Sequence, residues 1–170
     1  MNGARYIGWR GIVLGTRAPG ASILVRLLVG LVVFFPEGIQ KLLFPEILGA
    51  GRFLHIGIPY PEIMGPLVGV VEMLCGALII LGLFTRLAAI PLIVIMIVAI
   101  VSTKIPIWLG HDFWIFHLPK LARYGFWSMA HEARADFCML LGSLYLLIEG
   151  GGQWSLDWLL SRDHPARPNA

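Results

Sequence analysis

The stretch that decides the fold is IMGPLVGVVEMLCGALIILGLF, residues 63–84, whose one charged residue is Glu72. A helix crosses the hydrocarbon core of a bilayer with about 20 apolar residues, at about 1.5 Å per residue. This stretch is long enough and apolar enough to do so. The sequence therefore predicts a transmembrane helix with a single acid near its middle.

Three further segments are rich enough in Leu, Ile, Val and Phe to be read in the same way; they are residues 21–44, 87–105 and 133–151. Only Thr85 and Arg86 separate the second segment from the third, which predicts a tight antiparallel hairpin. The expected fold is an all-α membrane protein, a four-transmembrane-helix bundle.

The composition of the 170 residues excludes several classes of protein. Hydrophobic residues make up 58% of the chain and charged residues 14%, whereas a soluble domain carries about 25% charged residues. Such a chain cannot cover a water-facing surface, so a soluble enzyme domain and a disordered tail are excluded. The 13 Lys and Arg residues are scattered rather than clustered, so a nucleic-acid partner is not expected.

The chain divides into a membrane domain and two tails. Residues 1–20 contain several arginines and no continuous apolar core, so they are predicted to be a cytoplasmic tail rather than a cleaved signal peptide. The membrane domain spans residues 21–151, and residues 152–170 are expected to form an interfacial and cytoplasmic tail. An even number of spans places both termini on one side, and the N-terminal arginines favour the cytoplasmic side of the bacterial inner membrane.

Aromatic residues crowd the connection between the third and fourth spans, residues 106–132. Trp and Tyr concentrate at the headgroup level of membranes. This segment is therefore predicted to lie along the outer interface or to fold back over the bundle.

Charged residues share one face with glycine in each of the first two spans. At 100° per residue, each of two sets falls within an arc of about 60°: Arg26, Gly30, Glu37 and Lys41, and Gly65, Gly69, Glu72 and Gly76. Glycine allows close backbone approach, and charges avoid lipid. We expect these faces to meet, which makes Arg26, Glu37, Lys41 and Glu72 the candidate intramembrane polar site.

Depth along the helices decides which charges pair. Glu37 and Lys41 are an i,i+4 pair, and Lys104 and Asp136 both lie near the outer face, where they form a secondary charged pair. Arg26 is about 11 Å shallower than Glu72, so Glu72 is expected to lack a partner and to handle a proton or a ligand. The alternative is that all these charges only hold the helices in register.

The motifs resemble a known family. A first span ending in Glu37-Gly38-x-x-Lys41, a second with Glu72-x-x-x-Gly76, and the turn GLFTRLAA at residues 82–89 together resemble the DoxX family of small four-helix membrane proteins, over roughly residues 22–150. Some members of that family are subunits of a thiosulfate:quinone oxidoreductase, and others handle thiols and oxidative stress beside soluble redox enzymes.

The resemblance implies a membrane component of a quinone- or thiol-linked redox system. Quinone is then the candidate cofactor, none is expected to bind tightly, and the partner is a soluble redox enzyme or a larger membrane complex. Two alternatives stay open. One is a binding or transport module for a small amphipathic molecule, with its cavity between the first two spans. The other is a non-catalytic accessory subunit. No catalytic residue is identified, and the chain is at most an oxidoreductase component.

Cysteine and histidine do not point to a thiol relay or a metal site. The depths of Cys75 and Cys138 differ by about 10 Å, whereas the Cα atoms of a disulfide lie within about 7 Å. His111, His117 and His131 lack the helical spacing of a ligand set, so no metal is expected.

Overall fold

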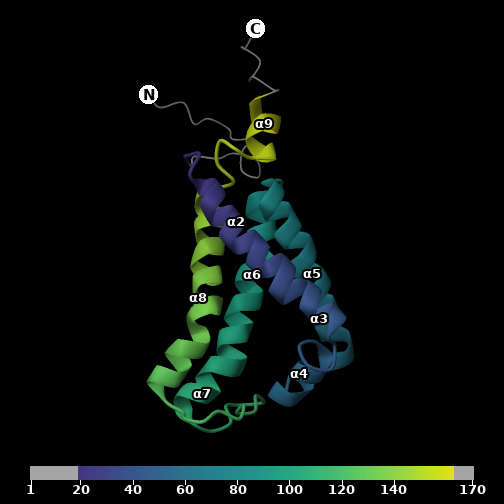
Figure 1. Cartoon of the computed structure of the whole chain (residues 1–170), viewed down its shortest axis with the longest axis vertical. Helices are drawn as coiled ribbons and strands as arrows, with labels where there is room; N and C mark the ends of the chain where they lie inside the picture. The colour runs from purple at the N-terminus through teal and green to yellow at the C-terminus, as the bar shows by residue number, and fades with distance from the viewer. Residues whose placement is uncertain (1–18, 163–170) are drawn as a thin grey trace, which may run out of the picture.

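The computed structural model describes residues 19–162, and every regular element in that range is a helix (Figure 1). The α-helices are α2 (Ser22–Val32), α3 (Gln40–Leu43), α4 (Ala50–Ile56), α5 (Pro61–Leu81), α6 (Thr85–Ala99), α7 (Ile105–Leu109), α8 (Phe126–Glu149) and α9 (Leu156–Arg162). Two π-helical segments, η1 (Val33–Ile39) and η2 (Ile100–Lys104), join α2 to α3 and α6 to α7. The predicted all-α class is confirmed.

Three helical stretches are long and apolar enough to cross a membrane: Ser22–Leu43, Pro61–Leu81 and Thr85–Leu109. They match the first three predicted spans. The fourth long helix, α8, packs along α6 and also contacts α2, η2 and α7. Its first half carries several charged residues (Glu132, Arg134 and Asp136), while its second half is apolar.

Two element boundaries differ from the predicted ones. Helix α5 ends at Leu81 because Gly82 and Phe84 adopt left-handed backbone conformations, with φ of 68° and 49°. The turn is therefore Gly82 to Phe84, and Thr85 and Arg86 form the first turn of α6 instead of the loop. Helix α8 begins at Phe126, seven residues before position 133, so part of the aromatic segment is helical.

Proline explains where the two π-helical segments lie. A proline has no N–H to donate to the carbonyl four residues earlier, and its ring crowds that carbonyl. Pro36 stands inside η1, and Pro106 follows η2 by two residues. The helix widens at both places, and π-helical turns of this kind often occur at functional sites.

The first two spans touch backbone to backbone, as their glycine faces predict. A Cβ atom added to Gly76 would lie 3.1 Å from the carbonyl oxygen of Gly30, and one added to Gly38 would lie 2.9 Å from the backbone nitrogen of Met73. Backbone atoms of the facing helix lie within contact distance at both positions, beside the Phe34 and Met73 side chains. The contact fixes which residue of one helix lies opposite which residue of the other.

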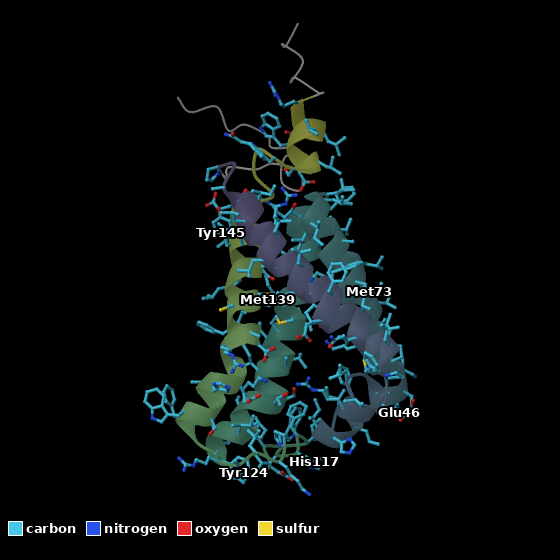
Figure 2. The ribbon with its side chains drawn as sticks, in the orientation of Figure 1. Glu46, Met73, His117, Tyr124, Met139 and Tyr145 are labelled. Carbon is cyan, nitrogen blue, oxygen red and sulfur yellow. The ribbon has the colours of Figure 1, made fainter. Side chains whose placement is uncertain are left out.

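The two ends of the bundle are closed differently. Helix α9 lies against the start of α2 and the α5–α6 turn, whereas α4 and α7 lie at the opposite end (Figure 1). Residues 110–125 cross that opposite end, where the His117 N–H donates to the carbonyl of Ile56 over 3.1 Å. Glu46 and His117 both lie there (Figure 2). The two ends are called the α9 end and the α4 end below.

Candidate functional site

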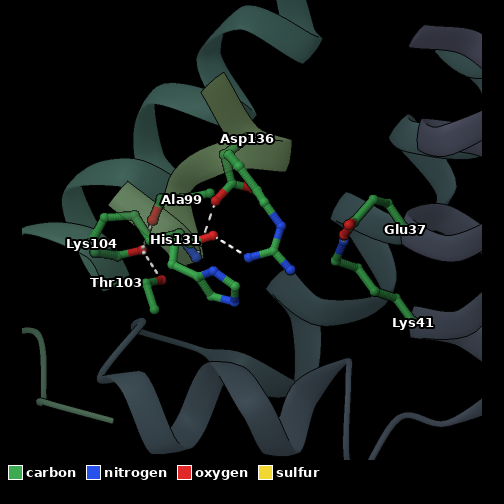
Figure 3. Close-up of polar contacts among 9 residues, drawn as sticks. Glu37, Lys41, Ala99, Thr103, Lys104, His131 and Asp136 are labelled. Atoms are coloured by element: carbon green, nitrogen blue, oxygen red, sulfur yellow. Dashed lines mark hydrogen bonds and ion pairs between the residues drawn. The ribbon is translucent and has the colours of Figure 1, made fainter. Parts of the chain in front are cut away.

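A lysine held between two carboxylates forms the centre of the candidate site. Lys41 Nζ lies 2.9 Å from Glu37 Oε2 and 2.7 Å from Glu72 Oε2. Glu37 stands in η1, Lys41 follows one turn later in α3, and Glu72 lies in the middle of α5. Figure 3 shows the pairing of Glu37 with Lys41. We call Glu37, Lys41 and Glu72 the charged triad.

The expectation that Glu72 lacks a partner was wrong. That expectation considered only the depth of Arg26 as a possible partner. The glycine contact, however, decides which residues of the first and second spans lie opposite each other. Gly38 lies against Met73, the residue next to Glu72. Lys41 stands about one turn beyond Gly38, so its ammonium group reaches the Glu72 carboxylate.

The triad runs from the interior toward the surface. The exposed fraction is 1% for the Glu72 side chain, 9% for Lys41 and 35% for Glu37. Glu72 Oε1 is buried and accepts no hydrogen bond from the described residues. The innermost acid is therefore only half satisfied by the protein.

A cavity of about 290 Å³ lies beside the triad. All three triad residues line it, together with apolar side chains of α4, α5 and α6, among them Phe53, Met64, Val68, Val94 and Met96. The polar atoms opposite the triad come from η2 and α8, through Ser102, Thr103 and Asp136. The cavity thus combines an apolar body with polar groups on the triad side and on the side of η2 and α8.

The cavity does not lie between the first two spans, where the amphipathic-molecule hypothesis placed it. The glycine contact leaves no room there, because added Cβ atoms would collide with the facing backbone. The space opens instead beside the glycine contact, between the charged triad and α4, α6, η2 and α8. The glycines set the spacing of the charges and do not form the cavity wall.

A second cavity, of about 450 Å³, adjoins the first at the α4 end. Arg52, Ile56 and Thr103 line both cavities. Arg52 is exposed, so a polar side chain stands where the two spaces meet. The pair of cavities connects the neighbourhood of the triad with the α4 end of the bundle.

The predicted contact between Lys104 and Asp136 is present, at 3.1 Å (Figure 3). It joins η2 to α8, and both side chains are largely buried, with exposed fractions of 7% and 18%. Asp136 lines the first cavity and Lys104 the second. This pair therefore stands beside the junction of the two cavities.

Arg26 does not join the triad. Its guanidinium donates to four backbone carbonyls at the α9 end, those of Ile79, Ile80, Gly151 and Trp154, over 2.6 to 3.2 Å. The first two carbonyls belong to the last turn of α5, where carbonyls lack the usual partner four residues later; the Ile79 carbonyl also accepts from the Gly82 N–H. The structure places Arg26 as a buried clasp on the helix ends.

Asp157 is a buried group that the sequence reasoning missed. From α9 its carboxylate accepts hydrogen bonds from the N–H groups of Phe84 and Thr85, over 2.7 and 2.9 Å. It thereby caps the start of α6, whose first turn contains no acid of its own. The sequence shows only an acidic residue in the C-terminal tail. That residue alone does not indicate which helix it caps.

Apart from His55, which lines the second cavity, the histidines and cysteines of the described residues do not line either cavity. His117 Nδ1 lies 3.1 Å from Asp112 Oδ2, and His111 contacts the Asp112 carbonyl, both on the exposed segment at the α4 end. The Leu118 N–H, and after it His117, lower the pKa of the Asp112 carboxyl. Over residues 19–162, no three His, Cys, Asp or Glu side chains gather as metal ligands would. Cys75 is a buried free thiol and Cys138 an exposed one.

The fold and the site define a small helical membrane protein that encloses a partly apolar cavity with a buried triad of charges. The chain belongs to the DoxX family, which matches residues 21–105. It is also similar to an uncharacterized membrane protein of Mycobacterium tuberculosis, with 49% identity over 150 residues, or 88% of this chain and 87% of the relative. No solved structure is significantly similar to the chain.

Proposed function

We propose that this protein binds a small amphipathic molecule in the 290 Å³ cavity, with the polar head of the molecule against the charged triad. The observation that carries the proposal is a buried ion pair at one wall of a mainly apolar space. Buried charges are costly, and ionisable groups within membrane spans commonly mark substrate or ion pathways. Ligand sites of other proteins have this composition, with an apolar lining and a few polar groups that fix orientation.

The size of the cavity limits the ligand. Ligand sites span about 300–1,000 Å³, so a space of about 290 Å³ suits a single ring or a short chain. The apolar body would lie among the Val68, Val94 and Met96 side chains. Any longer tail would leave through the opening beside Arg52.

A quinone-linked redox role is the second candidate. The observation that favours it is the graded exposure of the triad, from 1% at Glu72 to 35% at Glu37. A quinone gains and loses protons together with electrons, and a row of ionisable groups from the interior to the surface suits that exchange. This role needs an electron-donating partner, a soluble redox enzyme or a larger membrane complex.

The test is thermal unfolding of the purified protein in mild detergent, with and without a short-chain benzoquinone or 4-propylcyclohexanol. A ligand present at 100 times its Kd stabilises the folded state by about 2.7 kcal/mol. We expect at least one probe to raise the Tm. Glu72→Gln should remove most of that shift, and Glu62→Gln, at an exposed position of the same helix, should keep it.

Each probe answers a separate question. A shift with the benzoquinone supports the redox candidate, and a shift with the alcohol alone leaves binding of amphipathic molecules as the function. Unchanged Tm values with both probes, in wild-type protein that unfolds cooperatively, would contradict the proposal.

We further propose that α8 completes a four-span bundle in the bacterial inner membrane with both termini in the cytoplasm. The support is the apolar run at residues 137–148 and the pairing of Asp136 with Lys104, which neutralises the charge at the start of that run. Reporter fusions check the arrangement. Green fluorescent protein should fluoresce after residue 170, and alkaline phosphatase should be active after residue 123. The reverse pattern would refute it.

A further inference from the structure

We propose that the cavity selects molecules whose head donates hydrogen bonds, a hydroxyl or a protonated amine, over molecules of the same shape whose head only accepts them. The inference rests on the proposed function and names the class of ligand that the site takes. It comes from the balance of donors and acceptors in the charged triad.

The triad has more acceptors than donors. Two carboxylates present four oxygen atoms, and the single ammonium group of Lys41 offers three N–H groups. Two of those N–H groups serve Glu37 Oε2 and Glu72 Oε2. Glu72 Oε1 is left without a donor although the Glu72 side chain is 99% buried. A buried acceptor in this condition gains from any donor brought beside it.

The other polar groups around the cavity do not donate a hydrogen bond to Glu72 Oε1. The hydroxyls of Ser102 and Thr103 lie 3.4 Å apart, and Ser102 donates to the carbonyl of Ala99. Asp136 adds a further carboxylate and is already paired with Lys104. Arg52 is the remaining cation of the lining, and it is exposed at the junction of the two cavities. The three carboxylates of Glu37, Glu72 and Asp136 therefore dominate the charge that faces a bound head, and the donors that remain are the third Lys41 N–H and Arg52.

The head of the ligand then decides the affinity. A hydroxyl or ammonium beside Glu72 supplies the missing hydrogen bond, whereas a carbonyl oxygen sets its lone pairs against those of the carboxylate. A hydrogen bond to a charged group changes affinity by about 10- to 100-fold. Of a quinone couple, the same rule favours the reduced form, because its hydroxyls can donate.

The experiment compares ligands that differ in this property alone. The probes are 4-propylcyclohexanol, 4-propylcyclohexylamine and 4-propylcyclohexanone, with affinities measured by isothermal titration calorimetry on the full chain in nanodiscs. We expect the alcohol and the amine to bind about 10- to 100-fold more tightly than the ketone. Subtracting empty nanodiscs removes the contribution of partition into lipid.

A matched pair of variants ties the preference to one side chain. Glu72→Gln offers both a donor and an acceptor, so the ketone should approach the alcohol in affinity. Glu62→Gln, on the exposed first turn of the same helix, should keep the wild-type preference. If Glu72→Gln does not fold, the affinity ratio of the wild-type protein still decides the question.

The outcomes separate the two proposals. Equal or tighter binding of the ketone to the wild-type protein would overturn the donor preference and leave the binding function intact. No binding of any of the three probes would overturn the binding function, and the inference with it. If Glu72→Gln still preferred the alcohol and the amine to the ketone, a group other than Glu72 would recognise the head of the ligand, contrary to the inference.

Discussion

Lys41→Met is expected to destabilise the protein by about 3–5 kcal/mol, the usual cost of removing one partner of a buried ion pair. Methionine keeps the apolar length of the side chain but leaves the carboxylates of Glu37 and Glu72 facing each other without a cation. Glu72 is almost fully buried and cannot turn to water. Chemical denaturation in mild detergent, followed by circular dichroism, measures the change.

A double variant separates the charge effect from packing. In Lys41→Met combined with Glu72→Gln, no ionised carboxylate remains buried beside the methionine, so most of the lost stability should return. Lys120→Met, at an exposed position on the segment at the α4 end, is the matched control and should change stability little. A Lys41→Met protein within about 1 kcal/mol of wild type would contradict the role assigned to the pair, because that loss is far below the cost of an orphaned buried charge.

Arg26→Met is expected to be at least as damaging, with a loss of about 3 kcal/mol or more. Each buried polar group left without a partner costs about 1–3 kcal/mol. The carbonyls of Ile80 and Trp154 lose the donor that Arg26 supplies, while those of Ile79 and Gly151 keep the Gly82 N–H and the Ser22 hydroxyl. Some of the cost is recovered where water reaches the α9 end. The measurement is the same denaturation experiment, with hydrogen exchange of the α5 end and α9 as a local readout.

The conservative change gives the sharper comparison for this residue. Arg26→Lys keeps the charge, but a single ammonium group cannot reach all the carbonyls that the planar guanidinium reaches. The stability of this variant should therefore fall between those of wild type and Arg26→Met. Arg123→Met, at an exposed position, is the control for loss of an arginine as such. Equal stability of Arg26→Met and wild type would show that the clasp does not hold the helix ends.

Local sequence patterns predict much of the fold. Apolar runs of the right length locate the first three spans, and glycine spacing predicts which faces of the first two touch. The pair Glu37–Lys41 follows from helical spacing alone. Lys104 and Asp136 meet as the comparison of depth predicts, although α8 begins at Phe126 and Asp136 lies well inside it. Each of these features depends on one helix or on a simple comparison of depth.

The features that the sequence did not predict depend on how helices cross. The partner of Glu72 follows from Gly38 lying against Met73, a register that no single segment encodes. The position of the cavity follows from how α4, α6, η2 and α8 pack beside the charged triad. Asp157 binds the start of α6, 72 positions earlier in the chain. The sequence around Asp157 does not indicate that this helix is its partner.

The capping of α6 by Asp157 has a consequence for biogenesis. The α5–α6 hairpin can enter the bilayer early, yet the amide of Thr85 finds its carboxylate only after 72 further residues have been synthesised. Arg26 waits longer, for 125 and 128 further residues, before the carbonyls of Gly151 and Trp154 are made. The leading helices therefore remain incomplete at one end during translation, and a ribosome that stalls before codon 150 would leave a nascent chain that quality-control proteases can recognise.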